Sequence, residues 1–154
     1  MNREIIFRGK DIKGNWYEGL LAHNIAKDEW YISNKAGIST AYQVRPETIG
    51  QFTGLTDKND TKIFDGDVVR ICRQFGKFLY GEDNYVCKYD ANSASFKFYY
   101  IMPEDIADVN EYAMIGNGAA LSDMGRDFTI EVIGNIWDNP ELMSVVEKSE
   151  NVEK

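Results

Sequence analysis

Through the first two thirds of the chain, short stretches of alternating apolar and polar side chains are separated by clusters of turn-forming residues. This alternation has the period of a half-buried β-strand. The stretches Arg3–Lys10 and Trp16–Ala22 flank the turn cluster DIKGN and predict an N-terminal β-hairpin region, and Glu29–Asn34 predicts another strand. The runs YVCKYD and SFKFYYI flank ANSA and predict a second hairpin. The sequence therefore predicts a mainly β protein.

Two further strands are predicted in the middle and last parts of the chain. In KIFDGDVVRICR, Lys62–Arg73, the alternation continues across Gly66, so we expect one core strand entered through a turn at that glycine. Val69 and Ile71 should share a face of this strand, because alternate side chains point the same way. The run DFTIEVIGNIW, Asp127–Trp137, alternates in the same manner.

The last third of the chain also carries the signals of one or two short helices. Residues 103–116 begin with Pro103, repeat apolar residues at helical spacing and end at Gly116. A C-terminal helix is predicted from Pro140, because proline suits the first turn, where its missing N–H is not needed. Residues 144–154 are predicted to hold the end of that helix and a frayed tail.

Length and composition indicate a single domain with an adequate core. The chain has 154 residues, of which 44% are hydrophobic and 13% aromatic, so it needs neither disulfide nor metal to fold. Neither a signal-peptide core nor an apolar run of membrane-spanning length is found in the sequence. We therefore expect a cytoplasmic protein with free thiols at Cys72 and Cys87 and with no membrane partner.

Charge is distributed unevenly along the chain. The net charge is −8, and residues 103–154 hold 3 Lys/Arg against 12 Asp/Glu, whereas residues 1–102 hold 14 against 13. An acidic surface of this kind aids solubility. It would also repel nucleic acid or attract a basic partner, so nucleic acid is disfavoured as a partner.

The stretch from Thr48 to Ile71 holds four aspartates and three glycines, which raises the question of a metal site. A calcium loop can be traced through alternate positions from Asp57 to Asp65. The pattern fails at its sixth position, where Lys62 replaces glycine, and at its twelfth, where Val68 replaces the bidentate glutamate. The sequence therefore predicts no metal and no cofactor.

Acid–base chemistry is the other interpretation of these aspartates. Asp65 and Asp67 could form a pair, but such a pair needs surroundings that separate the two pKa values, and the neighbouring sequence supplies none. Architecture is the favoured interpretation, because glycine allows a sharp bend and short polar side chains bond to backbone N–H groups in turns. The residues assigned to structural turns are Asn59, Asp60, Asp65, Gly66 and Asp67.

The segments TIGQFTGLTDKNDTKIFDGDVV and EVIGNIWDNPELM, with the opening REIIFRGKD, resemble the YopX family of phage and prophage proteins. The resemblance extends from Arg3 to Met143 and departs at Asp60, where the family usually has glycine. It implies a mostly β fold with a small SH3-like barrel, in a phage- or prophage-encoded protein of the bacterial cytoplasm, and it brings no established catalytic residues. We accordingly expect one domain over residues 1–143, with an N-terminal β subdomain over 1–48 and a barrel core over 49–140.

The remaining reactive side chains offer few possibilities for catalysis. His23 is the single histidine and would have to be the base of a Ser- or Cys-type device, although a packed or surface histidine is far commoner. Cys72 and Cys87 are too few to form a tetrahedral zinc site, which needs four ligands. An enzyme that uses Asp65, Asp67 or His23 is therefore the second alternative.

One segment of the sequence favours a role in nucleic-acid binding. The segment Arg70–Tyr80 interleaves cations with aromatic residues, as in small barrels that bind single strands. The candidate surface residues are Arg70, Arg73, Phe75, Lys77, Phe78 and Tyr80. The competing interpretation, which we favour, places the aromatic rings in the core and lets the cationic stems cover a sheet face.

Together these patterns predict a non-enzymatic binding or interaction module with a protein partner. Short strands and many aromatic residues leave edges and apolar patches that oligomers cover, so we also expect a homo-oligomer. A nucleic-acid-binding protein that uses Arg70–Tyr80 is the first alternative.

Overall fold

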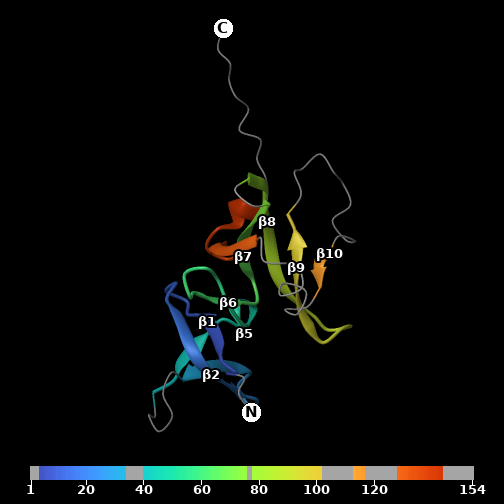
Figure 1. The fold of residues 1–154 in the computed structure, drawn as a ribbon. Coiled ribbons are helices and arrows are strands. Elements are labelled where there is room, and N and C mark those ends of the chain that lie inside the picture. The colour runs from blue at the N-terminus through green and yellow to red at the C-terminus, as the bar shows by residue number, and fades with distance from the viewer. Residues whose placement is uncertain (1–3, 34–39, 76–77, 102–112, 117–127, 144–154) are drawn as a thin grey trace. The chain divides into compact units, whose positions relative to one another are not determined.

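The structure is a computed structural model that describes residues 4–33, 40–75, 78–101, 113–116 and 128–143. For residues 73–75, 78–80 and 113–116 the description is of the backbone. The described chain is mainly β, as predicted, and forms two antiparallel sheets (Figure 1). The chain divides into two compact units, Met1–Gly66 and Asp67–Lys154, with one sheet in each.

The first unit holds a six-stranded sheet with the order β4-β3-β2-β1-β5-β6. Its elements are β1 (Phe7–Lys10), β2 (Trp16–Asn24), β3 (Glu29–Ser33), β4 (Tyr42–Val44), the 3-10 helix η1 (Pro46–Thr48), β5 (Gly50–Thr56) and β6 (Lys62–Phe64). The predicted N-terminal hairpin is confirmed, because β1 and β2 pair antiparallel with Lys10 opposite Trp16. The predicted strand at residues 29–34 is confirmed as β3, which pairs with β2.

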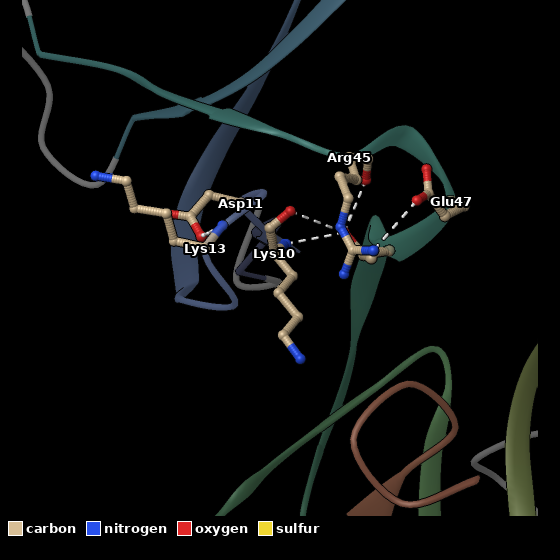
Figure 2. A network of polar contacts seen from close by, with 6 residues as sticks. Lys10, Asp11, Lys13, Arg45 and Glu47 are labelled. Carbon is tan, nitrogen blue, oxygen red and sulfur yellow. Dashed lines mark hydrogen bonds and ion pairs between the residues drawn. The ribbon is translucent and has the colours of Figure 1, made fainter.

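The first sheet bends back on itself, so that the end of β4 reaches β1 although two strands separate them in the sheet order. The Arg45 N–H donates to the Lys10 carbonyl at 2.8 Å. Thr48 is fully buried and joins the same two strands, because its Oγ1 accepts from the Lys10 N–H at 2.8 Å and donates to the Arg45 carbonyl at 2.7 Å. Figure 2 shows Lys10 and Arg45 meeting in this way. Gly9 permits the approach, since a Cβ there would lie 2.9 Å from the Val44 side chain.

The second unit holds a five-stranded sheet with the order β10-β9-β8-β7-β11. Its elements are β7 (Asp67–Phe75), β8 (Phe78–Asp90), β9 (Ser95–Tyr100), β10 (Ala113–Gly116), β11 (Phe128–Asn135) and the 3-10 helix η2 (Pro140–Met143). The predicted hairpin around ANSA is confirmed by the pairing of β8 with β9. In Figure 1 the strands β7 and β8 run beside each other as a long hairpin, and the register follows them from Val68 opposite Val86 to Phe75 opposite Phe78.

Neither sheet closes into a barrel among the described strands, so the expected small SH3-like barrel is not found there. The physical reason lies in β5, which pairs with β1 through Phe7 opposite Gln51 and with β6 through Phe52 opposite Phe64. These pairings place residues 50–64 in the N-terminal sheet. The chain accordingly divides between Gly66 and Asp67, whereas the sequence led us to expect a division after residue 48.

The prediction of one strand over Lys62–Arg73 is wrong. The segment forms β6 and β7, which belong to different sheets and different units. Gly66 between them has a φ of 89°, which confirms the predicted sharp turn at this glycine. The Asp65 N–H donates to the Gln51 carbonyl at 2.9 Å and holds the end of β6 against β5. Apolar and polar residues do alternate on each side of Gly66, but the strands before and after this glycine belong to different sheets.

The helix predictions are corrected in part. Ala113–Gly116, the predicted end of the first helix, is strand β10, because its backbone pairs with β9 through Ala113 opposite Tyr99. Residues 103–112 of that prediction lie outside the described residues. The predicted C-terminal helix begins at Pro140 as expected but is a short 3-10 helix to Met143, and its continuation over residues 144–154 also lies outside them. Within the described part of the chain, no helix is long and apolar enough to cross a membrane.

Strand β7 is buried along one face and at the start of the other. Val69 and Ile71 share one face, as predicted, and are 0% and 1% exposed. Val68 on the other face packs with Val86 and Ile101. Apolar side chains from β11 and from the segment after it complete this cluster, namely Ile133, Ile136, Leu142 and Met143, together with Tyr99 of β9.

Candidate functional site

Asp57 organises the turn between β5 and β6. Asp57 is 6% exposed. Its Oδ1 accepts from the N–H groups of Asn59 at 2.8 Å and Thr61 at 2.9 Å. The Asp57 N–H donates to the Thr61 carbonyl at 2.9 Å, and the Asp60 N–H donates to the Asp57 carbonyl at 3.1 Å. Asp60 has a φ of 61°, in the left-handed region. The predicted structural turn at Asn59 and Asp60 is thus confirmed.

Asp11 plays the same part in the turn between β1 and β2. Its Oδ1 accepts from the N–H groups of Lys13 and Asn15, both at 2.8 Å, and its Oδ2 accepts from the Tyr17 hydroxyl at 3.1 Å. The Asn15 backbone N–H is the largest cause that lowers the pKa of Asp11 from 3.8 to about 2, because it bonds the ionised form. Gly14, with a φ of 92°, stands at the position that Asp60 occupies in the other turn.

A third carboxylate, that of Asp90, holds the turn between β8 and β9. Its Oδ1 accepts from the Asn92 N–H at 3.0 Å, and its Oδ2 accepts from the Ser93 hydroxyl at 2.7 Å and from the Lys97 ammonium. The hydrogen bond from Lys97 is the largest cause that lowers the pKa of Asp90 to about 2, and the same bond raises the pKa of Lys97. Ala94 ends this turn with a φ of 51°.

These three aspartates therefore act in the architecture of separate hairpins. The sequence carries a signal for two of them that our prediction missed. DIKGN at residues 11–15 and DKNDT at residues 57–61 both place an aspartate three positions before the residue with positive φ. Hydrogen bonds from the backbone N–H groups two and four residues after each aspartate explain that spacing.

Asp65 and Asp67 lie on either side of the division between the units. The Asp65 carbonyl accepts from Arg8 Nη2 at 3.5 Å and would lie 2.4 Å from a Cβ added to Gly50, so the backbone of Asp65 is closely packed against β1 and β5. Asp67 begins β7 opposite Asn135 and is 1% exposed. Asp65 is thus described by its backbone contacts with the first sheet, and Asp67 by its burial at the start of β7, so the acid–base pair stays an untested alternative.

His23 lies near the end of β2, opposite Trp30 on β3. The imidazole stacks on the indole with ring centroids 3.9 Å apart and an interplanar angle of 7°. Its Nε2 is 2.9 Å from Asp28 Oδ1, across the turn that joins the two strands. Both contacts fix the ring within its own hairpin, so the structure gives His23 a packing role and does not bring it to Asp65 or Asp67 within their described contacts.

The described residues contain no cluster of three or more His, Cys, Asp or Glu side chains that could hold a metal. Cys72 is half-buried on β7 and Cys87 is buried on β8, and both are free thiols. In the sheet register Cys72 faces Glu82 and Cys87 faces Phe98. Both cysteines are therefore strand residues of the second sheet. That the whole chain binds no metal stays a prediction.

The candidate nucleic-acid surface lies along the hairpin of β7 and β8. Of its residues, only Arg70 has a described side chain; Arg73, Phe75, Phe78 and Tyr80 are described as backbone, and Lys77 lies outside the described residues. Arg70 Nε is 2.8 Å from Glu82 Oε1, with the two side chains 40% and 43% exposed. Glu131 of β11 stands directly opposite Arg70. Arg70 is therefore paired with one acidic residue and lies across the sheet from another.

Charge along this hairpin is balanced. Residues 67–90 hold four Lys/Arg and four Asp/Glu, so this part of the sequence has no net charge. Asp138, which follows β11, accepts from the Asn135 side-chain amide at 3.1 Å.

Basic residues also lie near the end of β1 (Figure 2). Figure 2 shows the side chains of Lys10 and Lys13 running in different directions, away from the ion pair between Arg45 and Glu47. Arg8 is packed between aromatic rings, with its guanidinium carbon 4.9 Å from the ring centroids of both Trp16 and Phe64. Lys10 Nζ lies 5.7 Å from the same Trp16 centroid, so Arg8 and Lys10 share this ring, whereas the Lys13 side chain runs in another direction.

The comparisons with known proteins agree with this fold. The family model described as YopX protein matches residues 7–144, which spans both units. Protein EF1440 from Enterococcus faecalis has a crystal structure that is similar with a TM-score of 0.51, at 22% sequence identity, over 92% of this chain and 99% of that one. At that identity the likeness concerns the fold alone. No curated protein matches the chain. From the match over most of its length, the chain belongs to the YopX family.

Proposed function

We propose that this protein is a non-enzymatic binding module, encoded by a phage or an integrated element, that acts on a protein partner in the host cytoplasm. The observation that carries the proposal is the dispersal of its reactive side chains. Asp11, Asp57 and Asp90 hold the turns of three different hairpins, and His23 is fixed in a fourth. An enzyme needs such groups to converge on one reacting atom.

Self-association is the second part of the proposal. Two observations support it. Each open sheet ends in edge strands, which are templates for pairing with another chain. Large apolar side chains also stand exposed, among them Ile12 at 89%, Ile25 at 83% and Leu20 at 55%. Light scattering during gel filtration, over a range of protein concentrations, measures the mass directly, and a monomeric mass at every concentration would remove this part.

The binding proposal is tested by affinity capture from a lysate of phage-infected host cells, with and without nuclease. We expect a protein that is retained after nuclease treatment and that then binds the purified chain in isolation. Retention of the same protein by Asp11→Asn and His23→Ala variants is expected, because these residues are assigned to hairpins. If every captured protein disappears with nuclease, the nucleic-acid alternative replaces the proposal.

The enzyme alternative has its own test. His23→Ala and Asp65→Asn variants should bind the captured partner as the wild type does and should leave that partner chemically unchanged, as judged by intact mass. A mass change in the partner that the wild type produces and His23→Ala does not would show catalysis. That result would overturn the non-enzymatic part and leave the binding part standing.

A further inference from the structure

We draw no further inference here: the strongest candidate, the exposed patch on the outer face of the first sheet around Leu20, Ala22 and Tyr31, carries none because nothing in the structure shows what covers it.

Discussion

Asp60 adopts a backbone conformation that glycine reaches more easily, with a φ of 61°. Aspartate tolerates this region better than most residues, because its short polar side chain can bond locally. The turn holds because Asp57 accepts from the backbone N–H groups of Asn59, Asp60 and Thr61. At the residue scale, then, the departure of this chain from the usual glycine is compensated by a neighbouring carboxylate.

The first prediction concerns Asp57. Asp57→Ala should lower the free energy of unfolding by about 2 kcal/mol, since it removes the acceptor of two backbone N–H groups in a nearly buried position. Asp57→Asn is the matched control, because its amide oxygen can accept the same bonds. Urea titration followed by tryptophan fluorescence gives both values. Equal losses for the two variants would show that the acceptor is not what holds the turn.

The second prediction concerns Gly66. Gly66→Val should lower the free energy of unfolding by more than about 1 kcal/mol, because a β-branched side chain opposes its φ of 89°. Gly81→Val provides the control, since a Cβ at Gly81 would meet nothing within 4 Å. Thermal melts of both variants are compared with the wild type. An unchanged melt for Gly66→Val contradicts the assigned conformation.

At the scale of elements, three of the hairpin turns are held by the same kind of hydrogen bond, from a backbone N–H group to an aspartate side chain. Asp11, Asp57 and Asp90 each accept the N–H of the residue two positions later. Each of these hairpin turns is thus held by a contact between residues close in sequence. Because Asp11 and Asp90 both have a lowered pKa, acid should weaken hairpins in both units.

The third prediction follows from that linkage. The folded pKa of Asp11, about 2, lies below the ordinary value of 3.8, so its ionised form stabilises the fold above pH 3.8 and that contribution is lost as pH falls toward 2. The melting temperature of Asp11→Asn should therefore fall less between about pH 4 and pH 2 than that of the wild type. Asp60→Asn, which keeps the positive-φ tolerance, is the control. Parallel curves for wild type and Asp11→Asn would refute the assignment.

At the scale of the whole molecule, the two units differ in net charge. Residues 1–66 hold nine Lys/Arg and nine Asp/Glu, and residues 67–154 hold eight and sixteen, so the whole net charge of −8 belongs to the second unit. The hairpin of β7 and β8, which has no net charge, lies within that acidic unit, with Arg70 paired to Glu82 and opposite Glu131. Long-range repulsion and local pairing both oppose phosphate binding there.

The fourth prediction is weak or absent nucleic-acid binding near physiological salt. Fluorescence anisotropy with single- and double-stranded oligonucleotides at about 50 mM and 200 mM salt spans the range in which phosphate-driven binding falls steeply. The double variant Glu82→Gln/Glu131→Gln should bind more tightly at the lower salt, because it frees Arg70. Micromolar binding by the wild type that is lost in Arg70→Ala and Arg73→Ala would instead support the nucleic-acid alternative.

The fifth prediction is that the fold needs no metal. Treatment with a chelator should leave the melting temperature unchanged, because a chain of 154 residues can bury enough surface to fold on its core alone. The melting temperature of the purified protein is measured before and after dialysis against the chelator. A fall of several degrees, restored by one divalent metal, would contradict the prediction.

Local properties of the sequence determined which segments form strands and where the turns fall. The hairpin of β1 and β2, the hairpin of β8 and β9 and the bend at Gly66 all followed from side-chain period and from turn residues. The sequence likewise predicted that the Asx-rich stretch around Asn59 and Asp60 is a turn. It missed Asp57 as the organising residue, although the spacing shared by residues 11–15 and 57–61 contained the signal.

Only the tertiary structure decided how the strands outside the two predicted hairpins pair. Lys62–Arg73 has one alternating pattern, but its two parts enter different sheets because β6 finds β5, while β7 finds β8 and β11. Ala113–Gly116 has helical spacing, yet its backbone pairs with β9. The position of Glu82 against Arg70 also depends on register across a hairpin. The pairings of β1 with β5 and of β7 with β11 join residues far apart in sequence, whose packing overrides local preference, whereas period and turn chemistry act within a few residues.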